Sequence, residues 1–376
     1  MIGVVLVFIP YYFCAGNWVP YLPLWLKDQG LRADEIAVIL GLPALLRVVS
    51  APLFSYVGDI YGKRRVIRIM ASLGGLAAAL LLMNDRYWPI LALASITFIS
   101  WQSMNVQLDS IAIEQVRKKA VPGYGVIRAC GSSAFISATL AGSAIMTSVG
   151  TDGILIAFVT SAALLVLATS QVSAKAGMAA PTEAAMPVTI WRQPRLISVL
   201  VAAALVHAAH AGFASFGALH MRQIGFSNMS LGIIIAMATA AEITMFFFGH
   251  LIMGWLRPIQ WIAVGAAIAT LRWVATAFVV TPLPLMALQL THAFTFSCTY
   301  MGMIGYLVET VDQRQIARAQ GMYIAMLGIF NSLVTLAVGS AFESMGSLAF
   351  IVSAVPTTLS LLIIGLRLRS LDPKFR

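Results

Sequence analysis

The chain has 376 residues, of which 60% are hydrophobic and only 10% are charged, and its mean hydropathy is +0.89. A typical soluble domain carries roughly 25% charged residues, so this composition excludes a soluble protein and indicates a core that lies within a membrane. The net charge of +10 would suit a polyanion-binding protein, unless the basic residues follow membrane topology instead.

Apolar stretches long enough to cross a bilayer, which takes about 20 residues, recur along the whole chain. We predict an all-α integral membrane protein with twelve transmembrane helices at residues 3–26, 34–57, 66–83, 87–113, 124–148, 152–171, 196–220, 229–254, 258–280, 283–309, 317–341 and 345–366. With these spans, 17 Lys and Arg residues fall on the side of Lys63 and four on the opposite side. Both termini are therefore expected in the cytoplasm, and nucleic acid is not expected as a partner.

The second span carries one arginine, Arg47, near its middle, where a charge is costly and therefore points to function. The span closes on a polar turn that contains Asp59, Gly62, Arg64 and Arg65. We predict a gating role for Arg47 and for this turn.

The two halves of the chain resemble each other at a shift of 195 positions. The shift places Leu24 on Leu219, Gly30 on Gly225, and Arg47 on Glu242, so that opposite charges occupy equivalent positions. Such repeats are one way in which transporters are built, with the binding site where the repeats meet. We predict two pseudo-symmetric six-helix bundles, residues 1–171 and 196–376, joined by a cytoplasmic linker at 172–195 that is rich in Ala and Pro.

Polar residues inside the first bundle define candidate substrate-binding positions. Asn17 lies at mid-depth of the first span, and Asp109 ends a polar stripe on the fourth. Arg128 lies about one turn into the fifth span from the same membrane surface, so the two charges can pair. The alternative is a purely structural bridge between helices.

The second bundle carries ionisable residues in four spans. His210 follows His207 by one turn, and we predict that it lines the pore, although packing is the alternative. Glu242 lies at the centre of its span, and an arginine, either Arg272 or Arg47, could move against it to change its protonation. A permanent ion pair is the alternative. Tyr323, which the 195-residue shift places on Arg128, is a further substrate-binding candidate.

The energy source and the substrate follow from what these residues can do. The sequence contains no GxxxxGK[ST] nucleotide-binding loop, so transport is expected to run on a gradient. Arginines outnumber carboxylates inside the spans, and aromatic residues are frequent, which suits a carboxylate attached to an apolar ring. No cofactor or metal is expected, because the three cysteines fall inside spans where they pack as small hydrophobes.

Several motifs resemble those of the major facilitator superfamily. The turn Asp59-x-x-Gly62-x-Arg64-Arg65 resembles its signature between helices 2 and 3, with Ser55 where a glycine is expected and Ile60 where a basic residue is usual. The start of the fifth span, with Arg128 and Gly131, looks like the lactose permease-like branch. The 3-phenylpropionate permease group is closest, in the stretches His210-Ala-Gly-Phe, Ala-Glu242, Arg272-Trp273, Leu290-Thr-His292 and Gln320-x-x-Tyr323.

This resemblance implies proton symport by alternating access. It implies that Glu242, Arg272 and His292 form the proton-coupling cluster and that Asp109 and Arg128 bind substrate. Thr295 stands where lactose permease has a carboxylate, which shifts coupling to Glu242 and disfavours sugar. We expect a monomeric, bacterial-type inner-membrane symporter of a small organic anion such as an aromatic carboxylate. The alternatives are proton-coupled export of amphipathic compounds, symport of sugars or nucleosides and, from another class, a membrane-embedded enzyme, although no nucleophile accompanies the histidines.

Overall fold

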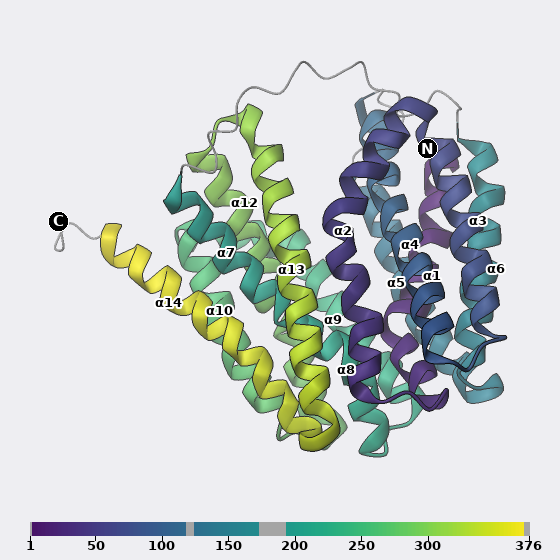
Figure 1. The fold of residues 1–376 in the computed structure, drawn as a ribbon. Coiled ribbons are helices and arrows are strands. Elements are labelled where there is room, and N and C mark those ends of the chain that lie inside the picture. Colours follow the sequence, from purple (N-terminus) through teal and green to yellow (C-terminus); the bar gives the residue numbers. More distant parts are fainter. Residues whose placement is uncertain (1, 118–123, 173–192, 372–376) are drawn as a thin grey trace. The chain divides into compact units, whose positions relative to one another are not determined.

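A computed structural model describes residues 2–117, 124–172 and 193–371, and these residues form helices and turns without any strand. The first half contains α1 (Ile2–Asp28), α2 (Ala33–Tyr61), α3 (Lys63–Leu81), α4 (Tyr87–Arg117), α5 (Tyr124–Val149) and α6 (Asp152–Ala168), which a 3₁₀ turn at Thr169–Gln171 extends (Figure 1). The all-α class predicted from the sequence is confirmed.

The second half is more segmented, because several of its spans are broken. Its elements are α7 (Pro194–Ala208), α8 (His210–Gln223), α9 (Asn228–Phe248), the 3₁₀ turns Gly249–Leu251 and Met253–Trp255, α10 (Pro258–Thr276), α11 (Pro282–Leu290), the π-helix η5 (Ala293–Cys298), α12 (Thr299–Thr310), α13 (Gln313–Met345), the 3₁₀ helix η6 (Gly346–Ser353) and α14 (Ala354–Leu371). Within the described ranges α7 continues into α8, α11 into α12 through η5, and η6 into α14, which leaves twelve spanning segments as predicted.

Eight of the described helices are long and apolar enough by themselves to cross a membrane. One of them, Arg318–Arg367, has 50 residues, about 75 Å of helix, which is enough for two crossings of a core about 30 Å thick. It turns at Gly346, whose φ is 54°. Three segments are not among these eight: α3, whose first two turns are basic, α4, which carries a polar stripe, and α11–α12, which η5 interrupts.

Glycine turns support the internal duplication. Gly30 follows α1 with a φ of 83°, and Gly225 follows α8 with a φ of 85°. These values belong to the left-handed region, which glycine adopts without steric cost. The two glycines are the pair that the 195-residue shift places on each other, so the same turn closes the first span of each half.

The structure divides into two compact units, each with its own core. Unit 1 comprises Met1–Glu183 and Gly225–Ala236, and unit 2 comprises Ala184–Ile224 and Met237–Arg376. The first part of α9 is thus grouped with unit 1, whereas the sequence analysis places that whole helix in the second bundle. The predicted linker, 172–195, lies mostly outside the described residues, and the predicted domain limits stay a prediction.

The core of unit 1 contains Phe8 and Tyr11 of α1, packed with buried residues of α3, α4 and α5. The larger core of unit 2 joins α7, α10, α12 and α13, and a smaller cluster surrounds Trp273 of α10. Since α1 packs on α5 and α6, and α7 on α13 and α14, the first helix of each half is held at the centre of its unit.

Candidate functional site

In unit 1, the structure brings the predicted substrate residues Arg128 and Asp109 together. Their Nη1 and Oδ1 atoms lie 4.0 Å apart, with side chains 41% and 32% exposed. Arg128 also donates a hydrogen bond to the Tyr12 hydroxyl, and its guanidinium lies 5.1 Å from the centre of that ring. An ion pair this long and this open is weak, so the guanidinium can turn to another carboxylate at little cost.

A glycine allows this contact between α1 and α5. A Cβ at Gly131 would lie 2.6 Å from Cδ2 of Tyr12, a distance at which one of the two must move. Gly131 therefore lets the Tyr12 ring lie flat on α5, one turn from Arg128. The sequence analysis did not select Tyr12 as a site residue; the motif glycine one turn after Arg128 was the available signal.

Arg47 belongs to the same cluster. Arg47, Asp109 and Arg128 all interact electrostatically with Tyr11, whose ring stacks on Trp101 at 5.6 Å between centroids. The Nε atom of Arg47 is buried and has no hydrogen-bond partner among the described residues. Among the described residues, two arginines and one aspartate thus act on the Tyr11 ring, a set with one positive charge in excess.

The polar stripe on α4 adds hydrogen-bonding groups to this cluster. Gln102 and Asn105 precede Asp109 on the same face, and each has a buried side-chain oxygen that lacks a partner within the described part of the chain. The indole Nε1 of Trp101 is likewise buried without an acceptor. Buried polar groups are normally paired, so these atoms are available to a bound molecule or to water.

Asn17 is not part of this accessible cluster. Its side chain is fully buried between α1 and α5, it donates from Nδ2 to the Phe13 carbonyl at 3.2 Å, and it packs where Gly142 leaves room. Its Oδ1 is buried without a hydrogen-bond partner among the described residues, and its substrate-binding role stays a prediction.

The predicted gating turn is built around Gly62, which ends α2 with a φ of 90°. Asp59 pairs with Lys63, Oδ1 to Nζ at 3.2 Å, and Lys63 also donates to the Ser110 hydroxyl of α4. Lys63 is buried, Arg64 is half-buried and Arg65 is exposed. The turn is therefore attached to α4 by Lys63, a residue outside the predicted gating set. Arg64 and Arg65 take no part in this Lys63–Ser110 contact.

In unit 2, Arg272 is the centre of a buried hydrogen-bond network. It is 2% exposed and donates to three neutral acceptors: Nη1 to Nδ1 of His292 at 3.2 Å, Nη1 to Oγ1 of Thr295 at 3.0 Å, and Nη2 to Oε1 of Gln289 at 2.7 Å. Its guanidinium carbon lies 4.6 Å from the Trp273 ring centre. No carboxylate among the described residues contacts Arg272 directly.

His292 connects this arginine to Glu242. The Nε2 atom of His292 lies 3.6 Å from Oε2 of Glu242. Because Arg272 can only donate, Nδ1 of His292 must accept and its proton must lie on Nε2, facing the glutamate. Arg272, His292 and Glu242, the three residues predicted to couple protons, thus form one connected network. In it, a neutral histidine lies between the charged arginine and the charged glutamate.

His210 is joined to the same network through Thr295. Its Nδ1 lies 3.1 Å and 3.2 Å from the carbonyl oxygens of Val206 and His207, which can only accept. Its Nε2 lies 3.0 Å from the Thr295 hydroxyl, which can act as donor or acceptor. Both ring nitrogens of His210 thus have protein partners, and its predicted contact with substrate stays a prediction.

Tyr323 contacts His207 and is largely buried. The tyrosine hydroxyl lies 2.6 Å from Nδ1 of His207, whose Nε2 donates to the Phe296 carbonyl at 3.0 Å. Phe296 lies in η5, where the helix widens and leaves carbonyl groups for side chains to use. The substrate role proposed for Tyr323 stays a prediction, and the π-helix is a feature that the 3.6-residue pattern could not reveal.

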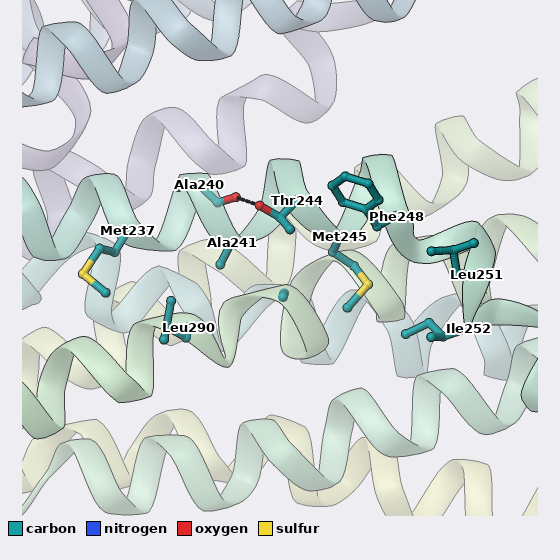
Figure 2. Close-up of a pocket in the computed structure, with 10 residues that line it drawn as sticks. Met237, Ala240, Ala241, Thr244, Met245, Phe248, Leu251, Ile252 and Leu290 are labelled. Atoms are coloured by element: carbon teal, nitrogen blue, oxygen red, sulfur yellow. Dashed lines mark hydrogen bonds between the residues drawn. The ribbon is translucent and has the colours of Figure 1, made fainter.

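A hollow in unit 2 is apolar, and its lining includes Ala241 and Ala293, the sequence neighbours of Glu242 and His292 (Figure 2). Its walls include Met237, Met245, Phe248 and Leu290. The Thr244 hydroxyl, which also lines it, donates a hydrogen bond to the Ala240 carbonyl at 2.8 Å. It offers no polar group that could orient a carboxylate. Across the described residues, no three His, Cys, Asp or Glu side chains gather to hold a metal ion.

The chain can be compared with known proteins on this basis. The profile of the MFS_1-like family matches residues 2–352. A protein of Escherichia coli strain K12 described as the probable 3-phenylpropionic acid transporter is 23% identical over 369 residues, which cover 93% of each chain.

Solved structures give the same fold. The nucleoside transporter NupG superposes with a TM-score of 0.83 at 14% identity, over 99% of this chain and 98% of that one. A bacterial homologue of the human lysosomal transporter Spinster, in an inward-facing and unoccupied conformation, superposes with a TM-score of 0.73 at 12% identity, over 98% and 96% of the two chains. At these identities the likeness concerns the fold, which is the predicted major facilitator fold. The chain belongs to the MFS_1-like family and is a multi-pass membrane transporter of the major facilitator superfamily.

Proposed function

We propose that the chain is a proton-coupled symporter of a small organic anion, an aromatic carboxylate, and that it works by alternating access. The observation that carries the substrate class is the arrangement around Tyr11 and Tyr12, where the charges of Arg47, Arg128 and Asp109 all act on Tyr11 and Arg128 lies 4.0 Å from Asp109. A substrate carboxylate would balance the surplus charge, and its ring would lie against the aromatic side chains.

The proposed order of events at the substrate follows from the loose pair. A carboxylate that approaches Arg128 competes with Asp109, whose Oδ1 is 4.0 Å from Nη1 of Arg128, and can take two parallel hydrogen bonds from the guanidinium. The partnerless oxygens of Gln102 and Asn105 would then accept hydrogen bonds from a donor on the substrate or from water.

The proton-binding group in the proposal is Glu242. His292 uses Nδ1 to accept from Arg272, so its ring cannot take a second proton without losing that hydrogen bond. His210 is held between Thr295 and two backbone carbonyl groups. The Glu242 carboxylate is 28% exposed and can be protonated in place. Protonation would remove the charge that balances Arg272, which makes the cluster responsive to the proton gradient.

The E. coli relative supports an aromatic acid as substrate. The likeness to NupG keeps nucleoside symport as the alternative, but a neutral nucleoside would leave the surplus arginine uncompensated. Export of amphipathic compounds in exchange for protons is the other alternative, and it differs in the direction of proton movement. We further propose a monomer in a bacterial-type inner membrane with both termini in the cytoplasm.

Proton movement in cells tests the proposal. Energy-depleted cells that contain the transporter are placed in weakly buffered medium, and 3-phenylpropionate, a nucleoside or a sugar is added while external pH is recorded. Symport predicts alkalinisation that only the aromatic acid evokes. Acidification would indicate exchange. A change in external pH with the nucleoside alone would show that the substrate is a nucleoside and not an aromatic acid.

A further inference from the structure

Unit 2 carries a cavity of about 580 Å³ at the end where α7 and α10 begin and α12 and α14 end. It shares no residue with the Arg272 network. Its volume lies within the range of small-molecule binding sites, which is about 300 to 1,000 Å³. By the distribution of Lys and Arg between loops, this end of unit 2 faces the cytoplasm.

The rim of the cavity is basic. Arg195, Arg257 and Arg367 line it, against one carboxylate, that of Glu309. Arg195 and Arg257 are exposed, whereas Arg367 is held in place by bonds from its Nε to the Ser198 hydroxyl at 2.8 Å and from its Nη2 to the Pro194 carbonyl at 3.3 Å. Three arginines and one glutamate among the described residues thus line one space, with a net charge of about +2.

Two helix ends reinforce this charge. Pro194 is the first residue of α7 and Pro258 the first of α10, and neither helix has an acidic residue in its first turn. The positive ends of both helix dipoles therefore remain uncompensated beside the arginines. Both prolines also line the cavity.

The inner wall of the cavity is apolar. Leu196, Val199 and Ile259 line it and are at most 5% exposed, as part of the larger core of unit 2. A free inorganic anion would use the basic rim alone. A molecule with a phosphate head and an adjoining hydrocarbon chain would use both surfaces, and such molecules surround a membrane protein at this depth.

We propose that this cavity binds the headgroup of an anionic phospholipid, with the phosphate among Arg195, Arg257 and Arg367 and the first part of an acyl chain along the apolar wall. The negative charge of Glu309 repels the bound phosphate and weakens its binding. The site is distinct from the proposed transport site, so it can be present whatever the chain transports.

The test uses the full-length chain purified in uncharged detergent, titrated with dioleoylphosphatidylglycerol or dioleoylphosphatidylcholine and followed by Tm and by native mass spectrometry of retained lipid. Phosphatidylglycerol is expected to raise Tm and to remain bound, and phosphatidylcholine is not. The double variant Arg195→Gln/Arg257→Gln is expected to bind phosphatidylglycerol roughly 30-fold more weakly, the equivalent of about 1 kcal/mol for each arginine. Glu309→Gln is expected to bind it roughly 5-fold more tightly.

The matched control removes two positive charges elsewhere, as Lys27→Gln/Arg86→Gln, both exposed at the ends of other spans. It should bind phosphatidylglycerol as the unmodified chain does. Equal weakening in this control would show diffuse attraction and overturn the proposal. Stabilisation by inorganic phosphate equal to that by phosphatidylglycerol would identify a free-anion site instead, and unchanged binding by the Arg195→Gln/Arg257→Gln variant would exclude this cavity.

Discussion

The Nη1 atom of Arg272 lies 3.2 Å from Nδ1 of His292, and this contact decides where the histidine carries its proton. With Nδ1 occupied as an acceptor, the N–H of the ring points from Nε2 to Glu242. The buried arginine and the partly exposed glutamate thus act on each other through one imidazole. A change in the charge of Glu242 must alter the network that holds Arg272.

Removing the charge of Glu242 tests the proposed proton-binding group. In Glu242→Gln the side chain keeps its shape but cannot take up a proton, so we predict that accumulation falls to the equilibrium ratio of about 1 whereas counterflow of substrate persists. The pH dependence of uptake should disappear as well. Uptake and counterflow of labelled 3-phenylpropionate in membrane vesicles measure these effects.

The control for this variant is Glu343→Gln, which removes an exposed carboxylate near the end of α13. It should accumulate substrate normally. Accumulation against a gradient by Glu242→Gln would show that another group carries the proton.

Replacing Arg128 by lysine tests the carboxylate contact. Lysine keeps the charge but cannot form two parallel hydrogen bonds, so affinity for an aromatic acid should fall about tenfold, or about 1.4 kcal/mol. The neutral amide of the same acid should bind both proteins equally weakly. Tm shifts of the purified protein over a range of ligand concentrations give both affinities.

Arg86→Lys, at an exposed position before α4, is the matched control and should bind the acid unchanged. If Arg128→Lys binds the acid as tightly as the unmodified chain, Arg128 does not hold the carboxylate, and its contact with Asp109 is structural.

The sequence was sufficient to predict the spans, because hydrophobic stretches of membrane length and the positions of charges along them are one-dimensional properties. Glu242, Arg272 and His292 could be grouped by resemblance, and the structure places them in one network. The contact of Thr295 with Arg272 could not be assigned, because Thr295 lies within the π-helix η5, where the direction of each side chain departs from the regular helical pattern. A helical repeat of 3.6 residues does not reveal such a departure.

Tyr12 and Lys63 illustrate a second limit. Tyr12 reaches Arg128 at a place where Gly131 has no side chain, and the buried Lys63 has its partners in Asp59 and in Ser110 of α4. Contacts between helices depend on which faces meet, and one sequence does not specify this. Asn17 shows the converse, since a polar residue at mid-depth is fully buried in a helix contact.

The Thr295 hydroxyl links Arg272 to His210, and its loss should affect both. In Thr295→Val the side chain keeps its volume, but one N–H of Arg272 and Nε2 of His210 lose their partner, so the free energy of unfolding should fall by about 1 to 3 kcal/mol. Thr295→Ser retains the hydroxyl and should remain within about 1 kcal/mol of the unmodified chain. Thermal unfolding in detergent compares the two. A loss in Thr295→Ser as large as that in Thr295→Val would show that the hydroxyl contributes no more to stability than the methyl group.

Adding one methyl group at Gly131 tests whether the Tyr12–Arg128 contact shapes the substrate site. The Cβ of Gly131→Ala would lie 2.6 Å from Tyr12, so the ring must move away and release Arg128, and we predict about tenfold weaker binding of an aromatic acid. Gly365→Ala on α14 meets no atom within 4 Å and should bind normally, with a gain in stability of about 0.5 to 1 kcal/mol because alanine favours the helix. Ligand titrations of both variants decide the question: unchanged affinity in Gly131→Ala would mean that Arg128 recognises the carboxylate without help from Tyr12, and the aromatic part of the proposed site would have to lie elsewhere.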